Sequence, residues 1–136
     1  MYNECMVRNG KPRVLMLYDF PLHGGGSGAY VKYLSLRLVE AYGYELAIAA
    51  PDDEVVDDIA HFKLSLPQVP VFLGRPGLEK AKKYSDLTPT EIGELAAAFI
   101  KGTIHAVEYF KPDIIHVHHV MINAWAARYA RSLFGT

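Results

Sequence analysis

The sequence predicts an α/β fold in which four parallel strands lie in the order 3-2-1-4, with helices on both faces of the sheet. Short apolar runs alternate with longer segments whose apolar residues recur at helical spacing. The runs are continuous, which is typical of parallel strands buried on both faces. The chain has 136 residues, and 51% of them are hydrophobic, which is enough for one domain with a buried core. We therefore expect right-handed crossovers in a three-layer domain.

The domain is expected to span residues 13–136, after a polar and flexible lead-in at residues 1–12. Residues 14–18 are the first apolar run and predict a strand, and residues 46–50 predict the second strand. The segment between them predicts a helix, because its apolar residues recur at helical spacing: Val31, Leu34, Leu38 and Tyr42.

The next strand and helix are expected in the middle of the chain. Residues 69–73 predict a third strand, which Pro70 confines to an edge of the sheet or to its own end. Thr88 predicts the start of a long helix, since Pro89 follows it and Glu91 completes a capping box. One face of that helix is expected to be apolar: Ile92, Leu95, Phe99, Thr103, Ala106 and Phe110.

The end of the chain predicts a fourth strand at residues 114–117 and an amphipathic helix at residues 121–134. The apolar side of this helix carries Ile122, Trp125, Tyr129 and Leu133. A doubly wound sheet normally adds a fifth strand beside the fourth after such a helix, so we expect this domain to be part of a longer protein. An unpaired fourth strand would favour self-association, with a contact near Ile115, Val117, Trp125 or Leu133.

Composition narrows the classes of function. Fourteen Lys and Arg balance fifteen Asp and Glu without a basic cluster, which argues against a nucleic-acid partner. The single cysteine, Cys5, excludes a disulfide within the chain and a zinc site built on several cysteines. The apolar runs are too short to cross a bilayer, and residues 1–12 lack the apolar core of a signal peptide. A soluble, cytoplasmic domain is expected.

A glycine cluster at residues 24–28, which includes Ser27, joins the first strand to its helix. Glycines at such a junction let the backbone approach a ligand closely, and the helix N-terminus favours an anion. Gly24, Gly26 and Ala29 also fit the dinucleotide pattern G-x-G-x-x-[GA], although five residues separate them from the strand. No Gly-Lys-Ser/Thr occurs, so a Walker A loop is excluded. The alternative is a surface loop without a ligand.

Histidines cluster at the carboxyl end of the fourth strand, where open α/β sheets bind their ligands. We expect His116 to be a partly buried, hydrogen-bonded strand residue, and His118 or His119 to meet a ligand. His116 and His118 share a side of the strand, as a metal pair would. No third His, Asp or Glu follows nearby in sequence, and we expect no metal here.

Two charged segments have a functional and a structural interpretation. Asp52, which follows the second strand, could hold a ribose hydroxyl in a nucleotide-binding fold, or serve as a solvated turn or helix cap. Lys80, Lys82 and Lys83 could favour an anionic acceptor or a peripheral membrane contact, or form a solvated face.

Three segments resemble the N-terminal domain of the family 4 glycosyltransferases, which have the GT-B fold. Residues 13–18 lead into the glycines at 24–26, and residues 111–118 read KPDIIHVH, close to the family's KPDIIHxH strand. Residues 43–46 resemble the family's GHEV turn, with Tyr44 in place of the usual His. The resemblance covers nearly all of the chain from Arg13 onward.

The resemblance implies a Rossmann-like domain of a retaining enzyme that transfers a sugar from a nucleotide-sugar donor to an acceptor. It places the donor diphosphate at Gly25 and Gly26 and the donor sugar at His118, with further contacts at Ser27 and His119. Most of the nucleotide site and an acidic E-x7-E motif belong to the family's C-terminal domain, so the resemblance implies that this chain alone is inactive. The donor is a substrate, and no separate cofactor is implied.

Other classes of function remain open on the residues alone. A dinucleotide-binding oxidoreductase half-domain would use Gly24, Gly26 and Asp52. A metal-dependent hydrolase would use His116 and His118. A non-catalytic, flavodoxin-like module would bind a protein partner through the open sheet edge.

Overall fold

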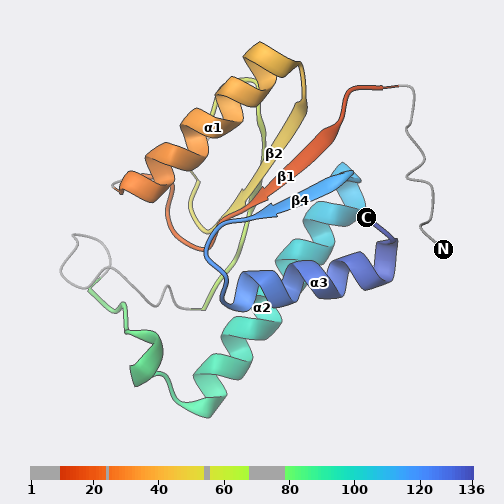
Figure 1. Cartoon of the computed structure of the whole chain (residues 1–136). Coiled ribbons are helices and arrows are strands. Elements are labelled where there is room, and N and C mark those ends of the chain that lie inside the picture. Colours follow the sequence, from red (N-terminus) through yellow and green to blue (C-terminus); the bar gives the residue numbers. More distant parts are fainter. Residues whose placement is uncertain (1–9, 24, 54–55, 68–78) are drawn as a thin grey trace.

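The computed structural model describes residues 10–23, 25–53, 56–67 and 79–136. Four strands form one sheet: β1 (Arg13–Leu17), β2 (Glu45–Ala50), β3 (Ala60–Lys63) and β4 (Ile114–Val117). Three α-helices accompany them: α1 (Gly26–Tyr42), α2 (Pro89–Phe110) and α3 (Ile122–Phe134). The strand order is β3-β2-β1-β4, and every neighbouring pair is parallel (Figure 1). The predicted α/β class, the parallel sheet and its order are confirmed.

Helices cover the sheet from both sides. Figure 1 shows α1 over one face, and α2 with α3 over the other. Alternate residues of β1 follow this division, because Val14 and Met16 pack in the core under α1 whereas Leu15 and Leu17 pack against α2 and α3. All four are buried. Burial on both faces explains why β1 is a continuous apolar run in the sequence.

The third strand lies elsewhere than the sequence suggested. β3 spans Ala60–Lys63 and pairs with β2 from Ala47↔Ala60 to Ala50↔Lys63. It is short, its first and last residues are exposed, and it ends in a lysine, as edge strands commonly do. Such a strand lacks the continuous apolar run that marks β1 and β2, so the sequence pattern missed it. The strand expected at 69–73 falls outside the described residues, as does most of the expected lead-in.

The start of α2 matches the prediction closely. The Thr88 hydroxyl accepts a hydrogen bond from the Glu91 main-chain N–H, and the Glu91 carboxylate accepts one from the Thr88 N–H. Pro89 occupies the first turn. Leu95 and Phe99 are buried as expected, whereas Ile92, one turn earlier, is exposed.

The packing face of α3 is a correction to the expected pattern. The helix buries its small residues, Asn123, Ala126, Ala127 and Ala130. The bulky residues of the opposite face point outward: Trp125 is 62% exposed and Leu133 is 54% exposed. Alanines let α3 approach α2 and the sheet closely, so the large apolar side chains do not mark the core here.

β1 and β4 are the neighbouring strands at which the helical connections switch from one face of the sheet to the other. From β1 the chain crosses to β2 through α1 on one face, and it reaches β4 through α2 on the other face. Ligands of open α/β sheets bind beyond the carboxyl ends of two such strands. No helix in the described ranges is long and apolar enough to span a membrane.

Candidate functional site

Tyr18 lies at the centre of the site, directly after β1. Its N–H donates to the Ala49 carbonyl (2.9 Å), and the His118 N–H donates to the Leu17 carbonyl (2.9 Å), so both pairings of β1 continue past its last residue. The Tyr18 and His118 rings therefore meet edge to face, with centroids 6.1 Å apart. The Tyr18 hydroxyl also shares a hydrogen bond of 2.8 Å with the hydroxyl of Ser27.

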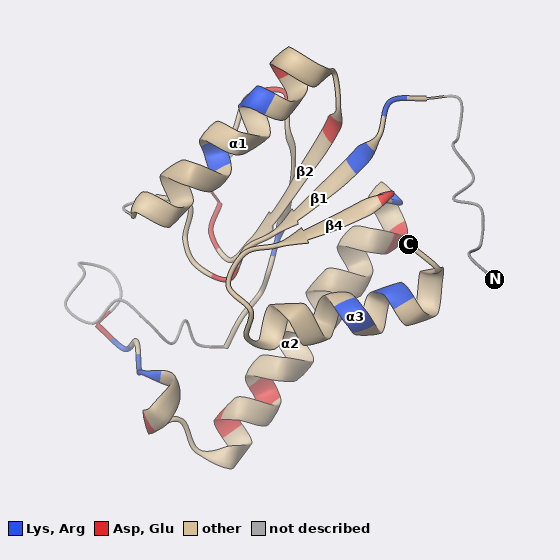
Figure 2. Cartoon of the chain, in the orientation of Figure 1, with Lys and Arg blue, Asp and Glu red and all other residues tan. Residues whose placement is uncertain are grey.

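That hydrogen bond brings the start of α1 to the same place. Gly25 is the N-cap in an extended conformation, and its carbonyl accepts from the Ala29 N–H (3.0 Å). The first N–H groups of a helix have no partner within the helix. The first turn of α1 has no acidic residue, and in Figure 2 the start of this helix is tan, the colour of residues other than Lys, Arg, Asp and Glu. This end of the helix therefore suits an anion. Gly24 lies outside the described residues.

The glycines of the first turn have different roles. A Cβ on Gly28 would lie 2.4 Å from the Leu22 carbonyl oxygen, so this glycine lets α1 pack against the preceding loop. A Cβ on Gly26 would meet no atom of the described residues within 4 Å. Gly26 is therefore open to the surroundings, which is what a backbone that contacts a ligand requires.

His118 is a half-buried and neutral imidazole. Burial, and next the nearby charges of His116 and His119, lower its pKa to about 4. Its ring stacks on His116 with centroids 4.5 Å apart, and Tyr30 of α1 meets it edge-on. Its Nε2 is buried and has no hydrogen-bond partner in the part of the chain that the structure describes. A neutral ring with an unsatisfied nitrogen can bond a hydroxyl or a phosphate oxygen.

His116 differs from the expectation. Its side chain is exposed at the edge of the sheet, and it stacks on His118 rather than forming a buried hydrogen bond. The reason is that β4 is hydrogen-bonded to β1 alone among the described strands, so no further described strand lies beside His116. Among the described residues, no three His, Cys, Asp or Glu side chains are grouped as a metal site would need.

His119 is paired with an acid that the sequence pattern did not single out. Its Nδ1 lies 2.7 Å from Oδ1 of Asp19, a residue that is 1% exposed. Burial raises the pKa of Asp19, and the hydrogen bond and charge of His119 oppose that rise. Asp19 has one signal in the sequence: it follows a buried strand almost at once, at the end where ligands bind.

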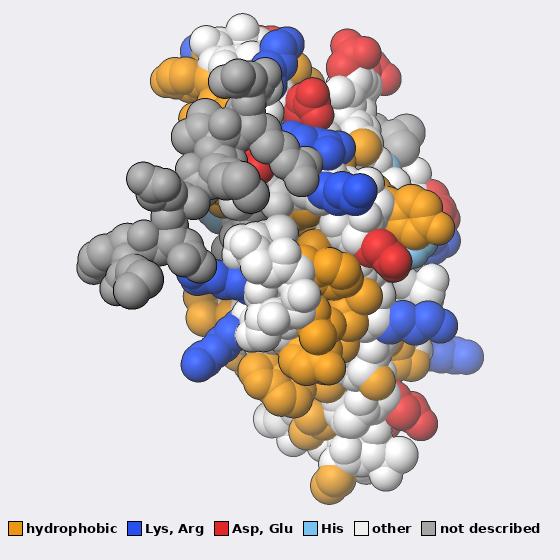
Figure 3. Space-filling view, turned by 90° about the vertical axis from the view of Figure 1, so that its right-hand side faces the viewer, with side chains coloured by type: hydrophobic (Ala, Val, Ile, Leu, Met, Phe, Trp, Pro, Cys, Tyr) orange, Lys and Arg blue, Asp and Glu red, His pale blue; other side chains and the backbone are white. Residues whose placement is uncertain are grey.

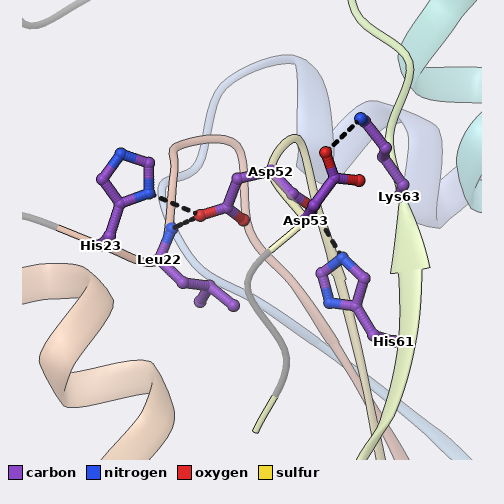
Figure 4. A network of polar contacts seen from close by, with 6 residues as sticks. All are labelled: Leu22, His23, Asp52, Asp53, His61 and Lys63. Carbon is purple, nitrogen blue, oxygen red and sulfur yellow. Dashed lines mark hydrogen bonds and ion pairs between the residues drawn. The ribbon is translucent and has the colours of Figure 1, made fainter. Parts of the chain in front are cut away.

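Asp52 stabilises a loop. Its Oδ2 accepts from the Leu22 N–H (2.8 Å) and contacts Nδ1 of His23 (3.0 Å), while its main-chain carbonyl bonds His61 (Figure 4). These contacts tie the segment after β1 to the end of β2. Oδ2 of the acid proposed for a ribose hydroxyl is thus in use within the chain, whereas its Oδ1 is buried without a hydrogen-bond partner among the described residues.

Lys82 also has a structural role, since its ammonium pairs with Glu91 at the start of α2.

The contacts of Tyr18 and Asp19 bring four of the expected site residues together: Gly26, Ser27, His118 and His119. No family model matches the chain, and a search of curated proteins finds no match either.

Proposed function

We propose that the chain is the N-terminal, Rossmann-like domain of a retaining glycosyltransferase that takes its sugar from a nucleotide-sugar donor. One observation carries the proposal. Tyr18 contacts Ser27 at the start of α1 and His118 at the end of β4. Two of the three segments that resemble family 4 glycosyltransferases therefore meet beyond the carboxyl ends of the strands, where such sheets bind ligands.

The start of α1 is the proposed site for the donor diphosphate. The main-chain N–H groups of Gly26 and Ser27 belong to the first turn, where the helix dipole favours negative charge. Charge on the diphosphate grows as the sugar leaves, so donors already in place would stabilise the transition state more than the bound substrate. Gly25, the N-cap residue, also has no side chain, so it lets the diphosphate come close to the backbone there.

His118 is the proposed contact of the donor sugar. With a pKa lowered to about 4, the ring is neutral at pH 7 and acts as a hydrogen-bonding group. It is not suited to act as a general acid at that pH, because almost none of it carries the extra proton.

The nucleotide and the remaining catalytic groups are proposed to lie on a second domain. The isolated chain is therefore expected not to transfer sugar. We also propose that the full-length enzyme acts in the cytoplasm. The first check is the reading frame beyond Thr136, where a second Rossmann-like half with an E-x7-E motif would agree with the proposal.

The decisive assay is sugar transfer by the full-length protein, with a panel of nucleotide hexoses that differ in base and sugar. Gly26→Val should block the diphosphate, and His118→Ala should remove a contact of the donor sugar. We expect each to lower turnover about 100-fold or more. His105→Ala is the matched control, because His105 is an exposed residue of α2 that contacts Phe62 and Tyr109.

Near-normal turnover of both site variants would contradict the assignment of these residues. A tight complex with a reduced nicotinamide dinucleotide, without sugar transfer, would instead favour the oxidoreductase class. Tight zinc in the purified protein would favour the metal-dependent hydrolase.

A further inference from the structure

Asp19 and His119 form a partly buried acid–imidazole pair beyond the carboxyl ends of β1 and β4, where sheets of this kind bind ligands. Asp19 follows β1 and His119 follows β4, so the pairing of these two strands brings together residues 100 positions apart in the chain. The Asp19 side chain is 2% exposed and that of His119 is 35% exposed. The acid is thus sealed from water while the imidazole reaches the surface.

The hydrogen bond indicates how the protons are arranged on the ring. An ionised Asp19 carboxylate can only accept, which assigns the proton of this bond to Nδ1 of His119. In the neutral ring this leaves the lone pair on Nε2, on a side chain that is 35% exposed. An imidazole oriented in this way by a buried carboxylate is arranged to accept a proton.

The backbone of His119 is held in an unusual conformation to achieve this. Its φ is +65°, in the left-handed region that non-glycine residues seldom adopt. The ring is held between Phe20, with centroids 4.7 Å apart, and Tyr18, with centroids 5.5 Å apart. Strained residues of this kind cluster at functional sites, where the surrounding structure holds them in place.

We propose that His119, positioned by Asp19, accepts the proton of the acceptor hydroxyl during sugar transfer. The inference rests on the proposed function and deepens it. Because the configuration is retained, the acceptor oxygen forms its bond to the anomeric carbon on the face from which the diphosphate leaves. The bond from that carbon to the donor phosphate oxygen breaks. The electron pair stays on the diphosphate, and the hydroxyl proton moves to Nε2 of His119. Asp19 then stabilises the imidazolium.

Among the described residues, His118 and Tyr84 are titratable groups that interact with the pair. His118 adjoins it in sequence, and its pKa is lowered in part by the charge of His119, so it is neutral when His119 is charged. The pKa of Tyr84 is raised to about 12 by burial and then by the charge of Asp19. Tyr84 therefore stays protonated throughout the working range of pH. Asp19 is the group that is hydrogen-bonded to the His119 ring.

The test begins with ¹⁵N-edited NMR of the histidine rings at pH 8, measured on the 136-residue chain. We expect the proton of His119 on Nδ1. Asp19→Asn should shift its ring signals, whereas those of His105 should not move. A ring protonated only on Nε2 would overturn the inference without any assay of activity.

The second arm measures transfer by the full-length protein across pH. His119→Asn suits the backbone, because asparagine tolerates positive φ. It should lower kcat 100-fold or more, within the range typical of a lost proton acceptor, with little change in the KM of the donor. Asp19→Asn should also lower kcat, because an amide can donate to Nδ1 and leave the ring proton on Nε2, where the acceptor proton must go. A merely structural pair would lose stability without this change of tautomer, which the NMR arm detects. His105→Asn is the control, and melting curves confirm that each variant is folded.

The outcomes separate the two ideas. Normal kcat in both variants, with transfer still lost in Gly26→Val, would overturn this inference alone. Absence of transfer by the unmodified protein would overturn the proposed function, and this inference with it.

Discussion

At the scale of single residues, burial decides what His118 can do. The ring lies against Tyr18, Tyr30 and His116, and its pKa falls from 6.5 to about 4, chiefly because burial disfavours the charged form. The folded protein therefore binds fewer protons at this residue than the unfolded chain between pH 4 and pH 6.5. Its contribution to stability is present above pH 6.5 and is lost as the pH falls toward 4.

We expect an NMR titration of His118 ring signals to give a midpoint near 4, with exposed His105 as the internal reference. His116→Ala removes one of the charges that lower the pKa, so the midpoint should rise slightly in that variant. A midpoint near 6.5 in the unmodified chain would contradict the half-buried position of the ring.

The two described glycines of the first turn of α1 should differ in tolerance. Gly28→Ala forces a methyl group onto the Leu22 carbonyl, and such overpacking costs about 1–3 kcal/mol. Gly26→Ala meets no neighbour and should leave stability unchanged or raise it by about 0.5 kcal/mol. Urea unfolding of both variants measures the difference. Equal losses would show that Gly26 is also a packing residue.

The sequence could indicate the main residues of the site but not their pairing. Gly26 and His118 stand out because each lies where a strand ends and the chain turns toward a helix. Asp19 and Tyr18 do not stand out, because their roles depend on which residues of β4 arrive beside them. That arrangement follows from the register Leu17↔Val117, which no local pattern encodes.

At the scale of elements, the capping box of α2 illustrates a local signal that decides local structure. Thr88 and Glu91 satisfy each other's main-chain N–H groups, as their spacing predicts. β3 and α3 show the limit of such signals. Edge position leaves β3 without an apolar run, and close packing favours alanine over the bulky residues of α3.

We expect Thr88→Ala to lower the free energy of unfolding by about 1 kcal/mol, because it removes the acceptor of the Glu91 N–H. Chemical unfolding checks this value. Thr90→Ala, within the same first turn but outside the capping box, is the control. A loss no greater than that of the control would show that the cap is not used in solution.

Glu91 should also make stability depend on pH. Its pKa is lowered to about 2, first by the hydrogen bond from Lys82 and then by that from the Thr88 main chain. A lowered carboxyl pKa contributes stability above the unfolded value near 4.5, and that contribution is lost as the pH falls toward 2. Glu91→Gln should therefore flatten the acid dependence of urea unfolding between pH 5 and pH 3. An identical slope in both proteins would contradict the assignment.

At the scale of the whole molecule, one side stays apolar. β4 is hydrogen-bonded to β1 alone among the described strands, and α3 exposes Trp125, Tyr129 and Leu133. Figure 3 shows hydrophobic side chains gathered on the side of the molecule that lies at the right of Figure 1. Unpaired edges and exposed apolar areas favour association.

We expect the isolated chain to self-associate, with a second copy covering the exposed side of α3. Sedimentation should show an association that weakens in Trp125→Lys. Tyr42→Lys, at the equally exposed end of α1, should not weaken it. A strictly monomeric chain at high concentration would contradict this expectation.

The most direct test of the central claim is a crystal structure of the full-length protein with a bound nucleotide sugar. We expect diphosphate oxygens about 3 Å from the main-chain nitrogens of Gly26 and Ser27, with the donor sugar against His118. A donor bound elsewhere, with the start of α1 and His118 both empty, would contradict it.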